Sequence, residues 1–293
     1  MVVRCPGQAL ATAPRRGSLL AAVARPKTTA PLSVMMPVYN EAGTLETIVS
    51  HVLARPEVGE LIAVDDGSTD SSWQVLQQLG QRDRRLRLFR QGTNQGKGAA
   101  LRRAISELRL PFAVVQDADL EYDPADYGRL LEPLAAGRAD VVYGVRGFAG
   151  QTAYSFWFVV GNGAVTLACN LLFNSYISDL ETGYKMLRSE LWQRLNLSGS
   201  RFDIEPDVTA RVLRLGYRIH EVPIHYYARS RQEGKKLTWR DGVVALGTLL
   251  RLRLRGRRAL FGEQDEYHRR RQQQLALYHP LRDSRSSLPP GTS

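Results

Sequence analysis

From residue 32 onward, short apolar runs alternate with amphipathic stretches, and this alternation is the feature that most restricts the fold. Apolar runs rich in β-branched side chains predict strands, and stretches with a helical period predict helices. The expected strands are Leu32–Val38, Glu60–Val64, Leu86–Arg90, Phe112–Gln116 and Asp140–Val145. The helices expected between them cover Glu41–Leu53, a stretch ending at Leu79, and Ala99–Leu108. Repeated β-α units with short connections predict an α/β, Rossmann-like fold, in which helices cover both faces of a mostly parallel sheet.

The chain has 293 residues, enough for one large domain or two modest ones. Its net charge of +11 is compatible with nucleic acid, a phosphorylated substrate or an anionic membrane surface as a partner. Nucleic acid is disfavoured, because the core of the chain has no recognisable nucleic-acid-binding module and the basic residues concentrate at both ends. Cys5 and Cys169 have no metal-ligand spacing and indicate no disulfide framework, so we expect a reducing, cytoplasmic location.

Both ends of the chain are expected to lie outside the fold. Residues 1–31 contain no Asp or Glu, and they carry Arg4, Arg15, Arg16, Arg25 and Lys27. No continuous apolar stretch follows these charges, which argues against a secretory signal peptide. An organellar transit peptide fits the composition, but a disordered basic arm, or a start codon placed too early, fits it better. Residues 262–293 are polar and are expected to form a disordered tail.

The second half of the chain departs from the simple alternation. Residues 147–178 contain no Asp, Glu, Lys or Arg, which makes a membrane span one interpretation. Gly161-Asn162-Gly163 and Asn170 interrupt the apolar pattern, so a buried or interfacial pair of helices is the better prediction. The elements expected after it are a strand over Tyr184–Leu187, a helix over Glu205–Leu215 and a strand over Arg218–Tyr226.

The folded domain is expected to cover residues 32–240, and a basic, apolar helix residues 241–261. This last segment combines Val, Ala and Leu with the arginines Arg251, Arg253, Arg255, Arg257 and Arg258. Such a helix could lie on an anionic membrane surface, with its arginines reaching lipid phosphates. An ordinary C-terminal helix with a solvated basic face fits the pattern equally well.

An acidic loop directly follows the predicted strand that ends at Gln116. It contains Asp117, Asp119 and Glu121, and Pro124 after it favours the first turn of a new helix. Ligands bind at the carboxyl ends of strands in open α/β sheets. Mg²⁺ or Mn²⁺, held by one or two carboxylates and the oxygens of a diphosphate, would relieve the repulsion between the carboxylates. A lone Asp-x-Asp pair, however, is more often a solvated acidic loop.

Four loops with distinctive residues fall at predicted strand ends. They are Pro37-Val38-Tyr39-Asn40-Glu41, Asp65-Asp66-Gly67-Ser68-Thr69-Asp70, Asn94 to Gly98, and Asp117-Ala118-Asp119. Each is a weak signal alone, since it could simply start or cap a helix. In this order on β-α units, they resemble the glycosyltransferases of family 2, which have the nucleotide-sugar-binding GT-A fold.

Further motifs resemble the dolichyl- or polyprenyl-phosphate sugar synthases of that family. They are Val145-Arg146, Asp179 to Lys185, Phe202 to Pro206, Glu221 to Ile224, Arg229, and Gly234 to Leu237. The similarity covers about residues 32–250 and excludes both tails. The resemblance implies a metal-dependent hexosyltransferase that moves a sugar from a GDP- or UDP-sugar, such as GDP-mannose or UDP-glucose, to a polyprenyl or dolichyl phosphate.

The resemblance also implies roles for individual residues. The nucleobase and ribose pocket would be lined by Pro37, Tyr39, Glu41, Val64 and Asp66, and the donor site would include Lys97 and the small Ala118. Mg²⁺ or Mn²⁺ would be held by Asp117, Asp119 and Glu121. Phosphates of donor and acceptor would be bound by Arg146, Arg229, Lys235 and Lys236. The residues expected to take part in catalysis are Asp119, Arg146, Asp179 and Glu181.

The implied mechanism needs no general base when the acceptor is a lipid phosphate. A phosphate monoester has a second pKa of about 6, so it is already an oxyanion nucleophile at neutral pH. The metal would act as a Lewis acid on the leaving nucleoside diphosphate, and arginines would align the acceptor phosphate. One displacement would then invert the anomeric carbon.

Many relatives carry C-terminal transmembrane helices, and none is expected in this sequence. Contact with the lipid is therefore expected from residues 147–178, from residues 242–261 or from a membrane-bound partner protein, at the cytoplasmic face of the membrane. Residues 155–174 lack the basic side chains that some relatives use near the acceptor phosphate. A homo-oligomer could form through residues 147–178.

Three alternatives stay open. A family 2 enzyme acting on a hydroxyl acceptor would need a general base, and Asp179 or Glu181 stands roughly where such enzymes keep one. An inactive nucleotide-sugar-binding scaffold is the second alternative, and the intact Asp117/Asp119 pair argues against it. A nucleotidyltransferase is the third, but it would carry a Gly- and Arg/Lys-rich phosphate loop after the first strand.

Overall fold

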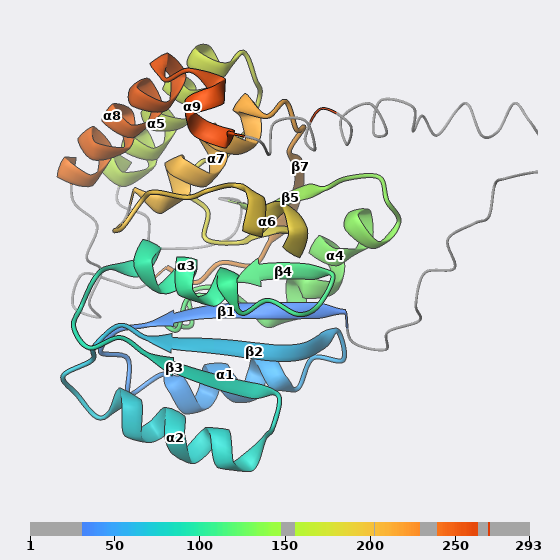
Figure 1. The fold of residues 1–293 in the computed structure, drawn as a ribbon, viewed down its shortest axis with the longest axis vertical. Coiled ribbons are helices and arrows are strands. Elements are labelled where there is room, and N and C mark those ends of the chain that lie inside the picture. The colour runs from blue at the N-terminus through green and yellow to red at the C-terminus, as the bar shows by residue number, and fades with distance from the viewer. Residues whose placement is uncertain (1–30, 148–155, 202, 229–238, 263–268, 270–293) are drawn as a thin grey trace, which may run out of the picture.

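A seven-stranded sheet lies at the centre of the computed structural model, which describes residues 31–147, 156–201, 203–228, 239–262 and 269 (Figure 1). The strands are β1 (Leu32–Val38), β2 (Val58–Asp65), β3 (Leu86–Arg90), β4 (Phe112–Val115), β5 (Val141–Arg146), β6 (Lys185–Arg188) and β7 (His220–Ile224). Their order is β3-β2-β1-β4-β6-β5-β7, and within this sheet only β6 is antiparallel to its neighbours. The predicted mostly parallel sheet is confirmed. The predicted basic arm and polar tail lie almost entirely outside the described residues.

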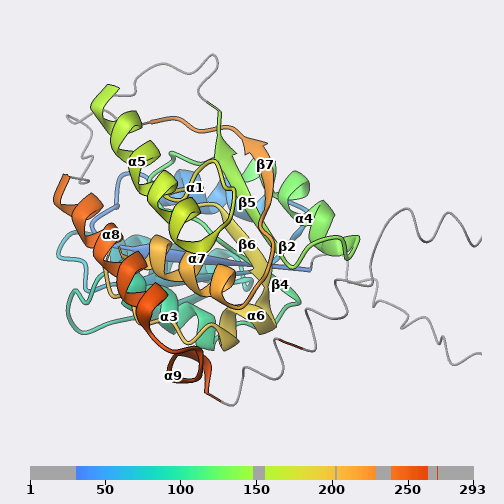
Figure 2. The same cartoon turned by 90° about the horizontal axis from the view of Figure 1, so that it is seen from above.

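Helices cover both faces of this sheet, as predicted (Figures 1 and 2). One face carries α1 (Leu45–Leu53), α2 (Ser72–Arg82) and α4 (Tyr127–Ala135), which follows a 3-10 turn at Pro124–Asp126. The other carries α3 (Lys97–Ser106), α6 (Ser189–Arg194) and α7 (Ile204–Arg214). Successive side chains of a strand point to opposite faces, so Val34 and Met36 join one core and Met35 the other.

The reversed direction of β6 decides which loops meet at one edge of the sheet. The C-terminal ends of the parallel strands all lie at that edge. Strand β6 runs the other way, pairing Leu187 with Ala113 of β4 and Met186 with Val142 of β5. The segment that precedes β6, Asp179 to Tyr184, therefore reaches the same edge as the ends of the other strands.

In the described part of the uncharged region after β5, residues Phe156–Phe173 form one continuous helix, α5, so the predicted interruption at Gly161-Asn162-Gly163 and Asn170 is wrong. Helix α5 packs against α7 and α8, and this packing offsets the low helix propensity of Gly161 and Gly163. Asn162 between them donates a side-chain hydrogen bond to Asp179 across 3.2 Å. Within the described ranges, no helix has both the length and the apolar character that crossing a bilayer would require.

The basic C-terminal segment consists of two helices, α8 (Trp239–Leu254) and α9 (Arg257–Phe261). Helix α8 packs against α5 and α7, and it lies beside α5 in both ribbon views (Figures 1 and 2). Its buried residues Ala245, Leu249 and Leu252 join the core on the α7 face of the sheet. Helix α8 therefore belongs to the packed layer of helices on this face of the sheet.

A buried ion pair in α7 fixes the loop before that helix. The carboxylate of Asp207 accepts from Arg211 Nε (2.6 Å) and from the backbone N–H groups of Ser198 (2.7 Å) and Gly199 (2.8 Å). In the residue after Gly199, the backbone carbonyl of Ser200 accepts a hydrogen bond from the N–H of Gly98 at the start of α3. Helix α7 thus holds a loop that packs directly on the N-terminus of α3.

We expect Asp207→Ala to lower the free energy of unfolding by about 3–5 kcal/mol, because the buried Arg211 guanidinium loses its partner. Glu190→Ala is the matched control, since Glu190 and Arg194 form an exposed pair with the same spacing, worth less than about 1 kcal/mol. Urea unfolding followed by circular dichroism measures both. Equal losses in the two variants would contradict the structural role given to Asp207.

Candidate active site

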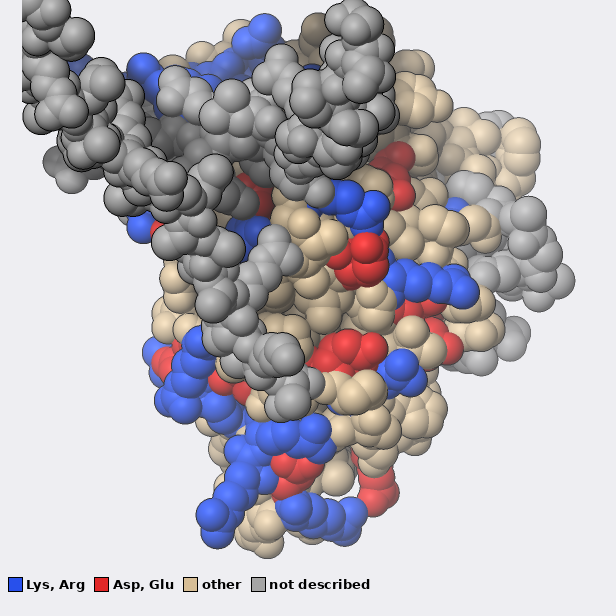
Figure 3. Space-filling model, turned by 90° about the vertical axis from the view of Figure 1, so that its right-hand side faces the viewer, with Lys and Arg blue, Asp and Glu red and all other residues tan. Residues whose placement is uncertain are grey.

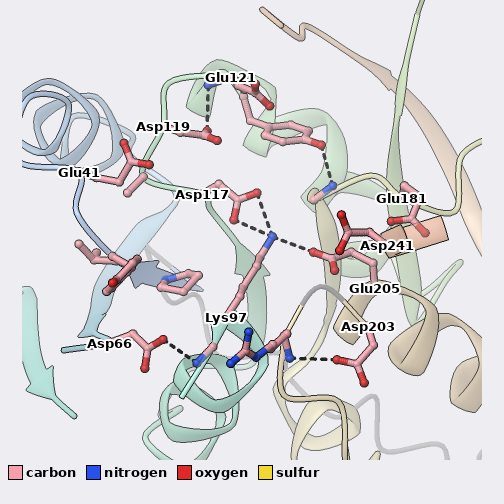
Figure 4. A pocket seen from close by; sticks show the side chains of 18 of the residues that line it. Glu41, Asp66, Lys97, Asp117, Asp119, Glu121, Glu181, Asp203, Glu205 and Asp241 are labelled. Atoms are coloured by element: carbon pink, nitrogen blue, oxygen red, sulfur yellow. Dashed lines mark hydrogen bonds and ion pairs between the residues drawn. The ribbon is translucent and has the colours of Figure 1, made fainter. Parts of the chain in front are cut away.

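A cavity of about 520 Å³ opens at the edge where the parallel strands end, a volume typical of small-molecule sites. Its walls come from the loops after β1, β2 and β4, the turn before α3, the loop before β6 and the first turns of α7 and α8 (Figure 4). Segments far apart in the sequence therefore converge there, as expected for the carboxyl ends of strands in an open α/β sheet.

The loops after β1, β2 and β3 hold one another in place. The N–H of Asn40 donates to Ser68 Oγ (3.0 Å), and Asn40 Oδ1 accepts from the N–H of Thr69 (2.9 Å). Gly67 has a φ of 70°, and a Cβ there would lie 2.7 Å from the carbonyl carbon of Thr93. Only glycine fits this close backbone approach. The small polar and glycine residues of these motifs therefore build a rigid floor for the cavity.

Asp66 shapes the turn that leads into α3. Its carboxylate accepts from the backbone N–H groups of Gln95 (2.9 Å) and Gly96 (2.7 Å) and from the side-chain amide of Gln91 (3.0 Å). Gly96 has a φ of 94°, a conformation that favours glycine. Asp66 thus lines the cavity with a carboxylate that is already hydrogen-bonded, and the turn that it holds presents Lys97 to the cavity.

A buried glutamine anchors the acidic loop after β4. Gln116 Oε1 accepts from the hydroxyls of Tyr127 and Tyr184, each at 2.6 Å, and Gln116 Nε2 donates to the carbonyl of Asp117 (3.0 Å). Leu120 has a φ of 63°, a left-handed conformation that costs a residue with a Cβ about 1–2 kcal/mol. Strain of this kind concentrates at ligand sites, where the surrounding structure maintains it.

Lys97 bridges two carboxylates that come from different elements. Its ammonium lies 2.8 Å from Asp117 Oδ1 and 2.7 Å from Glu205 Oε1 (Figure 4). Burial alone would lower the pKa of Lys97, but these two carboxylates hold the pKa well above its usual value. Lys97 is therefore a permanent positive charge between the acidic loop and the first turn of α7.

A second ion pair joins Arg146 at the end of β5 to Asp179. Arg146 Nε and Nη2 donate to the two carboxylate oxygens at 2.6 and 2.7 Å, and both side chains are buried. Burial would raise the pKa of Asp179, but the guanidinium holds this pKa below its usual value. Arg146 also packs over the ring of Tyr226, whose hydroxyl donates to Glu121 (2.5 Å). The conformation of Arg146 is therefore fixed on two sides.

Glu181 lines the cavity, and its Oε1 atom is buried without a hydrogen-bond partner among the described residues. Burial, reinforced by the nearby carboxylate of Glu205, raises the pKa of Glu181 to about 7. Burial also lowers the pKa of Lys185, whose ammonium donates to the carbonyls of Leu180 and Thr182. At neutral pH Glu181 is present in both protonation states, which suits a proton-transfer group.

The cavity is acidic although the chain as a whole is basic. Nine carboxylate side chains and three cationic ones, Lys97, Arg146 and Arg201, line it among the described residues, against a net charge of +11 for the chain. On the side shown in Figure 3, by contrast, basic and acidic side chains are interspersed. An anionic substrate such as a nucleoside diphosphate would therefore need added positive charge in the cavity.

The donor atoms in the cavity suit a hard cation such as Mg²⁺ or Mn²⁺, since carboxylate oxygens are the ligands that these ions prefer. Across the described part of the chain, no group of three His, Cys, Asp or Glu side chains is arranged to hold a metal by itself. Asp117 and Asp119 fit a metal that takes its other ligands from a diphosphate and water. The third predicted ligand, Glu121, accepts its hydrogen bond from Tyr226.

The structure brings most of the predicted site residues together. The predicted residues that line the cavity are Pro37, Tyr39, Glu41, Asp66, Lys97, Asp117, Ala118, Asp119, Glu121, Arg146 and Glu181. Val64 is instead fully buried in the core of the sheet, and Asp179 lies in its ion pair with Arg146 rather than among the described lining residues. The predicted phosphate ligands Arg229, Lys235 and Lys236 lie outside the described residues.

Several lining residues received no role from the sequence. They include Tyr122, Gly183, Arg201, Asp203, Glu205, Tyr226 and Asp241. Asp203 and Glu205 belong to the Phe202-to-Pro206 motif, so the sequence pointed to this segment but indicated no role for either carboxylate. Asp241 lies in the first turn of α8, a helix whose sequence pattern suggested a basic surface, and nothing local linked it to the acidic loop. Glu205 is the most consequential of these residues, because it shares Lys97 with Asp117.

Comparisons with known proteins agree with this geometry. The chain is 32% identical over 212 residues to the polyprenol monophosphomannose synthase of Mycolicibacterium smegmatis, covering 67% of this chain and 77% of that protein. It is 28% identical over 211 residues to the dolichol-phosphate mannosyltransferase of Pyrococcus furiosus, covering 70% of this chain and 58% of that protein. The chain thus spans less than two thirds of the length of this Pyrococcus relative. It also spans only 63% of the length of another curated relative, the glycosyltransferase AglJ of Haloferax volcanii.

A solved structure shares the fold. Glucosyl-3-phosphoglycerate synthase from Mycobacterium tuberculosis, in complex with Mn²⁺, UDP and glucosyl-3-phosphoglycerate, matches with a TM-score of 0.56 at 22% identity, over 76% of this chain and 80% of that one. This likeness shows a GT-A-like α/β fold. Residues 33–194, more than half of the chain, match the profile described as Glycosyl transferase family 2. Together with the 32% identity to a polyprenol monophosphomannose synthase, this match shows that the chain belongs to glycosyl transferase family 2.

Proposed function

We propose that this protein is a metal-dependent, inverting hexosyltransferase that moves a sugar from a GDP- or UDP-sugar to a polyprenyl or dolichyl phosphate. The observation that carries the proposal is the acidic cavity at the strand ends, in which Asp117 and Asp119 lie beside the loops after β1 and β2. The names of the Mycolicibacterium and Pyrococcus relatives support a lipid phosphate as acceptor. The Mn²⁺ and UDP bound by the Mycobacterium tuberculosis neighbour are consistent with a nucleotide donor and a divalent metal.

The donor would bind along the rigid floor of the cavity. Pro37 and the ring of Tyr39 offer apolar surface for a nucleobase, and the carboxylate of Glu41 suits hydroxyl groups of a ribose. Asp66 contributes mainly by holding the turn before α3, as its hydrogen bonds indicate. The diphosphate would then lie near Asp117, where Mg²⁺ or Mn²⁺, when bound, would supply Lewis-acid stabilisation of the leaving group.

The chain's own residues would orient the acceptor. A lipid phosphate is already an oxyanion at neutral pH, so the site needs to align it and needs no base to activate it. Arg146 lines the cavity and is fixed by Asp179 and by the ring of Tyr226, so its guanidinium suits an oriented phosphate. Arg229, Lys235 and Lys236 are proposed to complete the phosphate contacts.

Asp119→Ala should lower the transfer rate by about a thousandfold or more, since losing the metal removes several kcal/mol of charge stabilisation. The assay uses purified protein with Mg²⁺ or Mn²⁺, radiolabelled GDP-mannose or UDP-glucose, and a short polyprenyl phosphate, and follows the label into the organic phase. Asp123→Asn is the matched control, because Asp123 lies in the same acidic segment, caps the 3-10 turn through Ala125 and is absent from the cavity lining.

Metal-dependent labelled lipid with one donor would support the proposal and identify the sugar. Full activity in a folded Asp119→Ala variant would overturn it. Donor hydrolysis without labelled lipid would move the assignment to a hydroxyl acceptor, and donor binding with neither hydrolysis nor transfer would favour an inactive scaffold.

Transfer to a hydroxyl acceptor is the second candidate, and Glu181 is the residue that favours it. Its carboxylate lines the cavity and has a pKa raised to about 7, so it could accept a proton from a hydroxyl near neutral pH. The other predicted base, Asp179, is buried against Arg146 and has a lowered pKa, which makes it a weaker base.

The pH dependence of turnover separates the two acceptors. A base works in its deprotonated form, so with a hydroxyl acceptor kcat should rise as pH rises through about 7, and Glu181→Gln should abolish this rise. With a lipid phosphate, Glu181→Gln should retain turnover. The measurement is kcat between about pH 5 and 9, a range that spans the expected pKa values. Comparison of wild type with Glu181→Gln and Asp179→Asn tests both residues. Unchanged turnover in both variants would exclude a base mechanism.

We also propose that α5 and α8 contact an anionic membrane at its cytoplasmic face. Phe156, Leu171, Leu250 and Leu254 are exposed on these neighbouring helices, and Leu254 is 77% exposed. Residues 242–261 contain no acidic side chain, so the arginines of α8 add to the attraction for anionic lipids. The first turn of the same helix, with Asp241, lines the cavity, so a lipid lying along α8 could place its phosphate there.

The double variant Leu171→Glu/Leu254→Glu should bind vesicles with anionic phospholipids at least severalfold more weakly, because it buries less apolar surface and adds repulsion. The control is the double variant Gln77→Glu/Gln78→Glu, which adds the same charge at two exposed positions on α2. Cosedimentation at low and high salt is the measurement. Equal binding by the two double variants would contradict this membrane surface.

A further inference from the structure

We propose that Lys97 competes with the metal for Asp117, so that the metal enters the site together with the donor diphosphate rather than before it. This inference rests on the proposed function, since it concerns the metal site assigned there. It gives Lys97 a positioning role: the lysine holds the first carboxylate of the acidic loop until the diphosphate arrives.

The competition follows from the position of the ammonium. Lys97 Nζ lies 2.8 Å from one oxygen of Asp117 and 3.1 Å from the other, so the ammonium contacts both oxygens of this carboxylate. A cation bound by Asp117 in this geometry would lie beside the ammonium. Two positive charges at such a distance repel strongly in a partly buried site. The ammonium in this position therefore disfavours a metal bound to Asp117.

Lys97 has a second anchor that does not belong to the acidic loop. Its ammonium is 2.7 Å from Glu205 Oε1, in the first turn of α7, and Figure 4 shows both carboxylates directed at the same nitrogen. A lysine side chain has a flexible stem of four carbons, so the ammonium can leave Asp117 while it keeps Glu205. Lys97 would thus stay in the cavity after it releases Asp117.

A diphosphate removes the conflict that a metal alone creates. Its oxygens give the ammonium new anionic partners in place of Asp117, and they also complete the coordination of the metal. The absence of any group of three metal-binding side chains among the described residues agrees with this order. The described residues offer no complete ligand set for the metal alone, and Lys97 already neutralises Asp117.

A purely structural role for Lys97 predicts a different result. Removing a buried ammonium leaves Asp117 and Glu205 unpaired, which would lower stability whether or not a metal binds. Competition predicts in addition that Mn²⁺ binds more tightly without nucleotide once the ammonium is gone. Affinity for Mn²⁺ alone therefore separates the two roles without any measurement of activity.

The experiment titrates each protein with Mn²⁺ and follows the EPR signal of the free aqueous ion, with and without UDP or GDP. Lys97→Met should bind Mn²⁺ alone on the order of tenfold more tightly than wild type, and added nucleotide should improve its affinity less. Lys97→Gln keeps a hydrogen-bond donor without the charge and should behave in the same way, which protects the test if the Met variant does not fold. Circular dichroism checks each fold.

Arg201→Met is the matched control, because Arg201 is an exposed cation that lines the same cavity. Its removal should change Mn²⁺ affinity much less than removal of Lys97. An equal gain of Mn²⁺ affinity in this control would show that the effect comes from the overall charge of the cavity and not from Lys97. That result would overturn the inference. Wild-type binding of Mn²⁺ with nucleotide, but no gain in either folded Lys97 variant, would also overturn it. No Mn²⁺ binding by wild type under any condition would instead overturn the proposed metal site and function.

Discussion

Negative charge concentrated at one edge of the sheet is the constraint that the rest of the structure accommodates. The carboxylates there are stabilised in several ways. Backbone N–H groups hold Asp66, the ammonium of Lys97 is shared by Asp117 and Glu205, and Glu181 responds to its surroundings with a raised pKa. A basic chain can therefore maintain an acidic cavity, and the remaining imbalance of charge fits a site completed by a cation and a phosphorylated ligand.

The second property of the site is that hydrogen bonds within the protein hold the backbone of its loops in place. Asn40 joins the first loop to the second, and Gln116 ties the acidic loop to two buried tyrosines. Leu120 is held in a strained conformation by this framework. Asp207 and Arg211 extend the same rigidity to the loop that packs on α3. Groups aligned in advance lose little entropy when a ligand binds, and the proposed function requires this alignment of the donor and acceptor phosphates.

Helix α8 connects this cavity to the outer surface of the protein. Asp241 in its first turn lines the cavity, and Leu254 at its end is exposed beside the arginines of the C-terminal segment. The helix therefore runs from a charged site to an apolar and basic surface, over a length of about 24 Å for its sixteen residues. The proposed acceptor has the same polarity, with a phosphate at one end and a long apolar chain at the other.

The sequence by itself determined the α/β architecture, the order of the loops and the acidic pair Asp117/Asp119, because these follow from local periodicity and local turn chemistry. Only the tertiary structure decided the direction of β6, the continuity of α5, the burial of Val64 in the core and the pairing of Lys97 with Glu205, which are 108 positions apart. These features depend on contacts between distant segments, and such contacts can override local propensity or choose which face of a strand points inward. A local pattern does not contain that information.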